Sequence, residues 1–284
     1  STTPASLQYE TPAFVWGANA AFRGRESEMG VDVRAADGET HELFRFAGGD
    51  FTRKRVAGGE TLVVGTYAEG WRNFGNTLLS GGVRIDWWEA THGMRVESDR
   101  TDGAILLEAR ADDSHAWMPT ARLGLRRTYG DAAFRVAAYS SFRPPTLNEL
   151  HRPFRVGNDI TEANAALKPE YLYGIDAALE GASAAADWSI GVFALRLADP
   201  ITNVTFGSGP GTFPPGVFVP AGGTYRARRN AGRIEAFGVE ADARGQFAAA
   251  GAWRAALSYT DARVDGGGVA PQLTGLRPAQ APAR

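Results

Sequence analysis

The feature that most constrains the fold is a two-residue alternation of apolar and polar side chains, clearest on both sides of residues 142–170. In residues 132–142 the apolar side chains share one parity, while Arg135, Tyr139 and Ser141 share the other. Residues 171–179 repeat the pattern. A period of two over this length is that of half-buried β-strands. The sequence therefore predicts an all-β, antiparallel protein, with residues 142–170 as a long polar excursion between two strands.

The whole chain reads as about nine such strands. They are residues 13–23, 61–72, 77–89, 119–129, 132–142, 170–180, 187–197, 233–246 and 252–263. The connections alternate between short ones (73–76, 130–131, 181–185 and 248–251) and long ones (24–60, 90–118, 142–170 and 198–232). Within the last of these, residues 207–223 hold too much Pro and Gly for a strand ladder. In an up-and-down sheet, every short turn then lies at one end and every long loop at the other.

This asymmetry is typical of bacterial outer-membrane barrels, which have short periplasmic turns and longer outer loops. Aromatic residues flank the short turns, as expected at the lipid headgroup level; they are Trp71, Phe74, Tyr129, Phe134, Trp188, Phe247 and Trp253. Charged residues fall in mid-strand on the parity opposite the bulky apolar residues. The pattern predicts an antiparallel, up-and-down transmembrane β-barrel in the outer membrane of a Gram-negative cell, with lipid outside and a wet lumen.

A soluble β-sandwich or propeller would also show alternation. Sandwiches rarely keep all long loops at one end through nine strands, and no repeat of the propeller period, about 40–50 residues, is visible. The alternation therefore favours the membrane barrel over both.

Composition narrows the function classes further. The 284 residues contain no run of about 18 apolar residues, so a helical membrane protein is excluded. The absence of cysteine removes disulfides, thiolate catalysis and cysteine-based zinc sites. A net charge of -2 gives no basic face, so no nucleic-acid partner is expected.

Four segments carry a resemblance to a known family. Residues 141–150 (SFRPPTLNEL), 164–170 (NAALKPE), 230–240 (NAGRIEAFGVE) and 273–281 (LTGLRPAQA) resemble, in family order, barrel segments of TonB-dependent outer-membrane receptors. The resemblance covers roughly the second half of the chain. It implies a barrel of about 22 strands with a plugged lumen. It also implies uptake of an extracellular substrate, such as an iron chelate or cobalamin, with energy from the TonB complex.

The chain departs from the family pattern at both ends. It offers no candidate plug domain, no TonB box and no closing strands, and nine is an odd count where bacterial barrels have even numbers. We therefore expect residues 1–284 to form a partial barrel, with the plug domain that contacts TonB absent. The expected function is a part in active transport across the outer membrane. A passive diffusion channel and a soluble extracellular β-domain that binds carbohydrate or protein stay as alternatives.

The excursion holds the candidate substrate-binding residues. They are Arg143, Asn148, Glu149, His151, Arg152, Arg155 and Asn158. Arginine presents a forked set of donors that suits carboxylate or phosphate, so the cluster predicts capture of an anionic small molecule. The structural alternative is that Arg143 and Glu149 pair to hold the base of the loop.

No catalytic, metal or cofactor site is expected. The four histidines (His41, His92, His115 and His151) lie in predicted loops, apart from one another, and neither H-E-x-x-H nor G-x-S-x-G occurs. The lumen-facing strand charges are expected to balance one another, or a plug, rather than bind substrate; they are Arg122, Arg126, Arg135, Asp176, Glu180, Glu240, Asp242 and Arg244.

Overall fold

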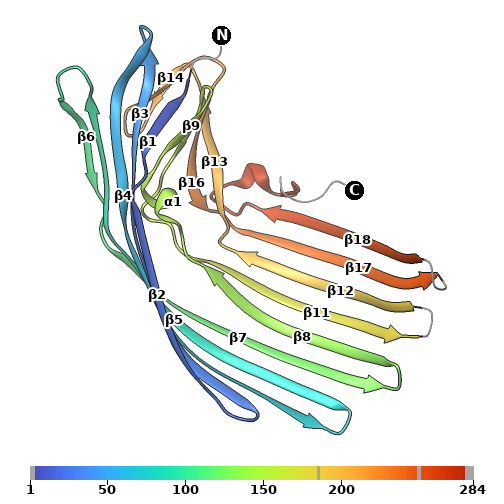
Figure 1. The fold of residues 1–284 in the computed structure, drawn as a ribbon. Helices are drawn as coiled ribbons and strands as arrows, with labels where there is room; N and C mark the ends of the chain where they lie inside the picture. Colours follow the sequence, from blue (N-terminus) through green and yellow to red (C-terminus); the bar gives the residue numbers. More distant parts are fainter. Residues whose placement is uncertain (1–3, 184–185, 248–250, 279–284) are drawn as a thin grey trace.

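A computed structural model describes residues 4–183, 186–247 and 251–278, and most of these lie in β-strands (Figure 1). The main sheet contains β1 (Ser6–Glu10), β2 (Ala13–Arg23), β3 (Ser27–Ala47), β4 (Asp50–Phe74), β5 (Thr77–Asp99), β6 (Ile105–Arg110), β7 (Ser114–Tyr129), β8 (Ala132–Arg143), β11 (Glu170–Ala182), β12 (Ala186–Ala198), β17 (Arg233–Phe247) and β18 (Gly251–Asp265). Its order is β1-β3-β4-β5-β7-β8-β11-β12-β17-β18, with β2 paired to β3 and β6 to β5. The all-β, antiparallel prediction is confirmed.

The prediction of a long connection over residues 24–60, with extended strand only in parts such as residues 42–46, is wrong. These residues form β3 and the upper half of β4, joined by a turn at Gly48 and Gly49. The strand was missed because its inward residues are charged: Asp32 and Arg34 alternate with Val31 and Val33. With β3 included, ten described strands reach the short-turn end, and the odd count becomes even.

Two other predicted loops also contain strands. Residues 90–118 contain the end of β5, all of β6 and the start of β7. Residues 207–223 contain a short ladder between β14 (Gly211–Phe213) and β15 (Val217–Val219), contrary to expectation. His41, His92 and His115 accordingly lie on strands, not in loops, and His151 lies on a helix. The turns predicted at 181–185 and 248–251, and the motif at 273–281, fall partly outside the described residues.

The two faces of the spanning strands differ as the alternation predicts. Large apolar side chains such as Phe22, Val83 and Leu257 are exposed on the outward face. The inward face carries ion pairs between strands. Three join adjacent strands, namely Arg135–Asp176, Arg244–Asp187 and Arg254–Asp242, and three reach across one intervening strand, namely Arg84–Asp32, Arg122–Glu69 and Arg126–Glu180. Most predicted inward charges therefore do balance one another. In this sheet the apolar face is exposed and the opposite face is charged. A β-sandwich has the reverse arrangement, because the apolar faces of its two sheets pack against each other.

A second layer packs inside the loop end of the main sheet. We call it the inner layer: α1 (Leu147–His151), β9 (Phe154–Val156), β10 (Asp159–Glu162), β13 (Ile201–Ser208) and β16 (Thr224–Asn230). The four strands form a sheet in the order β13-β16-β10-β9, beside the upper halves of β3 and β4 in Figure 1. Neither α1 nor the 3-10 turn η1 (Pro271–Leu273) is long or apolar enough to cross a membrane.

A small apolar core joins the inner layer to the main sheet. Leu150 of α1 and Leu167 pack with Trp88 and Met118, and all four are buried. Trp88 and Met118 sit on the inward face of β5 and β7, so this core marks the level at which the lumen is filled by the chain itself. Toward the loop end from this core, the contacts between the two layers are mainly ionic.

Candidate functional site

The segment that follows β8 turns inward because of its local sequence. Pro144 and Pro145 end the ladder, since proline lacks the N–H a strand needs. Thr146 then caps α1: its hydroxyl accepts from the Glu149 amide at 3.3 Å, and the Glu149 carboxylate accepts from the Thr146 amide at 2.8 Å. This reciprocal capping box fixes where the helix starts.

Arg143 holds the base of this turn. Its guanidinium donates to both oxygens of Glu149, at 2.8 and 3.2 Å, and also to Glu170 at the start of β11. Partial burial pushes the pKa of Glu149 up, but the hydrogen bonds from Arg143 and Thr146 outweigh it and keep that pKa below its ordinary value. Arg143 and Glu149 therefore pair as the structural alternative predicts.

Arg228 of β16 caps the other end of α1. It donates to the main-chain oxygens of Asn148 (2.6 Å) and Arg152 (2.8 Å) at the end of the helix, and it lies over the ring of Phe154. The Asn148 oxygen also accepts from the Arg152 amide at 3.2 Å. Burial lowers the pKa of Arg228. The cation thus ties α1 to β16, and Asn148 takes part through its main chain.

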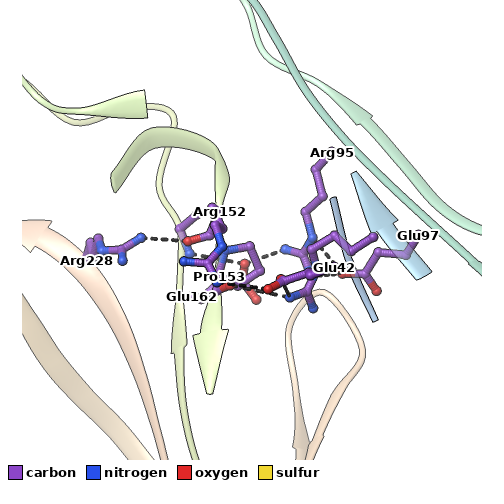
Figure 2. A network of polar contacts seen from close by, with 9 residues as sticks. Glu42, Arg95, Glu97, Arg152, Pro153, Glu162 and Arg228 are labelled. Atoms are coloured by element: carbon purple, nitrogen blue, oxygen red, sulfur yellow. Dashed lines mark hydrogen bonds and ion pairs between the residues drawn. The ribbon is translucent and has the colours of Figure 1, made fainter. Parts of the chain in front are cut away.

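An arginine–glutamate network joins the inner layer to the main sheet (Figure 2). Its members are Glu42, Arg55, Arg95, Glu97, Arg152 and Glu162. Glu42, only 1% exposed, accepts from Arg55 at 2.6 Å and from Arg152 at 2.9 Å. Three arginines face three carboxylates, so the network is formally neutral. It connects β3, β4 and β5 to α1 and β10.

The far half of the network runs through Glu97. One oxygen of Glu97 accepts from Arg55 at 2.8 Å and from Arg95, which also pairs with Glu162 of β10. Burial alone would raise the pKa of Glu97, but the two arginines outweigh it and lower that pKa. A buried ionic chain of this kind fixes geometry more than it adds stability.

Arg152 is therefore a structural residue in this state. Besides Glu42, its guanidinium donates to the side-chain oxygen of Gln8 on β1 through both terminal nitrogens, with Nη1 at 3.1 Å. Its Nε and the second oxygen of Glu162 are buried without a partner among the described residues.

His151 packs into a hollow made by glycine. Its ring lies on Gly59 and Gly93, at the bulge where the β4–β5 register shifts. A Cβ at Gly93 would stand 2.3 Å from the ring, so only glycine fits there. The ring is buried, its Nε2 has no partner among the described residues, and burial lowers its pKa. His151 is placed as a packing residue.

Arg155 and Asn158 lie at the tip of the inner layer, on the turn between β9 and β10. Arg155 donates only through Nε, to the Gly157 oxygen at 2.7 Å, and it has no carboxylate partner in the described parts of the chain. Asn158 donates to the Ala221 oxygen at 3.1 Å. Of the seven predicted site residues, five thus hold or join the structural contacts around α1, and these two stay at the accessible tip.

The family-like motifs meet at the junction of the two long excursions. Asn230 donates to the main-chain oxygens of Lys168 (2.9 Å) and Asp199 (2.8 Å) and accepts from the Lys168 amide. Asn164 donates to the Arg228 oxygen at 3.0 Å. These asparagines bind main chain 62 to 64 residues away in the case of Lys168 and Arg228, and 31 residues away in the case of Asp199. The polar residues of the motifs therefore join distant segments of the chain.

Sequence reasoning missed Arg228 and most of the network. Glu42, Arg55, Arg95 and Glu97 fell in segments expected to be loops, where a charge is ordinarily solvated. The run Arg226–Ala227–Arg228–Arg229 was the available signal, because such a cluster needs carboxylates or carbonyls nearby. Across the described ranges, no group of three or more His, Cys, Asp or Glu residues is arranged to hold a metal ion.

Comparisons with known proteins agree with this architecture. Similar solved structures include the ferric yersiniabactin uptake receptor FyuA from Yersinia pestis (TM-score 0.60, 12% identity, 89% of this chain and 35% of that one). They also include the FrpB iron transporter from Neisseria meningitidis (0.55, 13%, 89% and 37%). A third is the Serratia marcescens hemophore receptor HasR, solved as a double mutant with HasA and heme (0.54, 13%, 82% and 42%).

At these identities the likeness shows the fold alone, and the chain spans about two fifths of the length of each structure. No curated protein matches the chain by sequence. The family model described as "TonB dependent receptor-like, beta-barrel" matches residues 2–284. That family consists of transport receptors rather than enzymes. The chain therefore belongs to the TonB-dependent receptors, through their β-barrel.

Proposed function

We propose that this chain forms part of the barrel wall and mouth of a Gram-negative outer-membrane receptor. The receptor binds an extracellular small molecule, such as an iron chelate or cobalamin, and imports it with TonB-coupled energy. The plug domain and its contact with TonB belong to another part of the same protein. The observation that carries the proposal is the two-faced wall, apolar outward and charged inward, with a polar layer folded inside its loop end.

The charge of the inner layer supports an anionic substrate. Its strands carry four arginines (Arg155, Arg226, Arg228 and Arg229) against two carboxylates (Asp159 and Glu162), a formal excess of +2. Arg229 is exposed and lies over the ring of Phe206, 5.7 Å from its centroid, which leaves its donors free to face solvent. The names of the structural neighbours, which refer to iron, a ferric siderophore and heme, support a metal chelate as the substrate class.

The test is uptake by cells that lack the gene and carry it back on a plasmid. Radiolabelled ferric yersiniabactin, heme and cobalamin serve as probes, each with and without the proton motive force. We expect accumulation of at least one probe only in complemented, energised cells. Accumulation that persists without energy would show a passive channel, and a protein recovered in the aqueous phase after detergent partition would show a soluble domain; either result overturns the proposal.

Arg155→Ala tests the site itself in the same cells. A charge-assisted hydrogen bond is worth about 1.5–3 kcal/mol, so the loss of Arg155 should weaken binding of an anionic probe about tenfold or more. Arg110→Ala is the matched control, because within the described ranges Arg110 pairs only with exposed Glu108 on β6. If the two variants bind the anionic probe with equal affinity, Arg155 does not contribute to the binding site.

A further inference from the structure

Strand β1 is held on the loop end of β3 by a short ladder. Four residue pairs join the two strands, and a register shift between Gln8 and Glu10 interrupts them. By contrast, β2 pairs with residues 28–38 of the same strand through eleven residue pairs. A segment with so few contacts opens easily, so its side chains decide how firmly β1 is held.

The side chains of β1 contact both the mouth and the adjoining strand. The side-chain oxygen of Gln8 accepts from the guanidinium of Arg152, at the end of α1. The Tyr9 ring meets the His41 ring edge-on, with 6.1 Å between the centroids. Lys54 of β4 lies 6.0 Å from the centroid of the Tyr9 ring. The position of β1 is thus coupled to α1 on one side and to His41 on the other.

His41 lies between two carboxylates. Its Nδ1 is 3.2 Å from Oε2 of Glu10 on β1, and its Nε2 is 2.7 Å from Oε2 of Glu39 on β3. A neutral imidazole carries a single N–H, so one of the two carboxylates would then face a lone pair. Both contacts are favourable only when the ring is protonated. The Glu39 contact stays within β3, whereas the Glu10 contact crosses from β1 to β3.

We propose that His41 is a proton-operated clasp that holds β1 on the loop end of the sheet. The protonated ring pairs with Glu10 and Glu39 together, whereas the neutral ring holds β1 less firmly. Because the docked state binds the proton, the stabilisation is present at low pH and is lost as the pH rises. The titratable side chains around the ring on β1, β3 and β4 are Tyr9, Glu10, Glu39 and Lys54. Among these side-chain types and histidine, only histidine ordinarily changes charge between pH 5 and 8.

The exposure of the two carboxylates sets the size of the effect. The side chain of Glu10 is 58% exposed and that of Glu39 is 35% exposed. An ion pair in contact with solvent changes an equilibrium by up to about fivefold. Such a change alters how often a short edge strand opens without unfolding the sheet. The clasp lies at the loop end, which the proposed function places outside the cell, so it responds to the pH of the surroundings.

Hydrogen exchange of the β1 amides in the intact, purified protein tests the clasp, with each rate corrected for the intrinsic effect of pH. Between pH 5.5 and 8 the wild-type rate should rise about two- to fivefold. In His41→Gln the rate should be the same at both pH values. Glu39→Gln should move the transition to lower pH, because it removes a negative charge that favours the protonated ring. His92→Gln is the matched control, because His92 pairs with Glu60 on β4 and lies on β5, which does not pair with β1. It should respond like the wild type.

A wild-type rate that does not change with pH would overturn the proposal, and so would a rise that His41→Gln leaves unchanged. If His41→Gln leaves β1 without protection at both pH values, Glu10→Gln replaces it. That variant keeps the ring but removes the charge on β1, so the pH response should disappear; a response of wild-type size would overturn the clasp. None of these outcomes affects the uptake proposal, which probe accumulation tests separately.

Discussion

At the scale of single residues, Glu42 carries the docking of the inner layer. It is nearly inaccessible and is shared by Arg55 and Arg152. Glu42→Ala would leave Arg152 without a carboxylate and Arg55 with Glu97 alone. Removing one partner of a buried ion pair ordinarily costs about 3–5 kcal/mol. We expect a loss of that size in the free energy that keeps α1 docked, measured by hydrogen exchange of the α1 amides.

Glu108→Ala is the control for Glu42. Glu108 pairs with Arg110 in solvent, where an ion pair is worth about 0–1 kcal/mol, so this variant should exchange like the wild type. Equal exchange in the two variants would mean that the network does not hold the layer.

His151 should make the docking of α1 on the main sheet sensitive to mild acid. Burial lowers its pKa below the ordinary 6.5 in the docked state. Above pH 6.5 the ring is neutral whether α1 is docked or released, so it contributes no pH dependence. As pH falls below 6.5, only the released ring takes up a proton, and docking should weaken by up to about 1.4 kcal/mol per pH unit.

We expect the hydrogen-exchange rate of the α1 amides, corrected for the intrinsic rate, to rise as pH falls from 6.5 to 5.5. The rate in His151→Gln should not rise. His92→Gln, on an exposed ring, should keep the wild-type response. The pKa values of Glu97 and Glu149 are lowered, so their contributions are lost only below about pH 4.5, outside this window. A rise that His151→Gln leaves unchanged would assign the effect to another group.

At the scale of elements, the facing of each spanning strand decides the cost of a charge. Phe237 and Leu257 point outward and are 54% and 65% exposed. Phe237→Arg or Leu257→Arg should cost about 2–4 kcal/mol if the side chain lies near the bilayer midplane. Glu240→Ala, on the inward face of the same strand as Phe237, should cost far less. Urea unfolding from lipid vesicles measures all three, and equal penalties would contradict the facing.

The elements also show where sequence patterns succeed. β2 was predicted with its observed bounds, because its outward face is aromatic and its turns are marked by glycine and charge. β3 was missed, because a strand whose inward residues are ionised has the composition of a loop. The capping box T-x-x-E and the Pro144–Pro145 pair were both visible in the sequence, but α1 was not predicted, since five residues make no helical period.

At the scale of the whole molecule, the long connections are expected outside the cell and the short turns in the periplasm. The chain has no cysteine, so single cysteines can report this directly. Thr101→Cys, between β5 and β6, should react with a membrane-impermeant maleimide on intact cells. Asn76→Cys, in the exposed turn between β4 and β5, should react only after the outer membrane is opened. The reverse pattern would invert the orientation.

What the sequence determined by itself is the wall. Side-chain parity is a local property, so the alternation of Phe237, Gly238, Val239 and Glu240 sets which face of the strand is apolar before any strand has a neighbour. The mouth, by contrast, depends on contacts that form only when the chain folds. Whether Arg152 captures a ligand or pairs with Glu42 depends on a carboxylate 110 residues away, and contacts over such separations leave no periodic trace in the chain. The candidate site changed for that physical reason: a charge is a binding group or a structural one according to what the fold brings beside it.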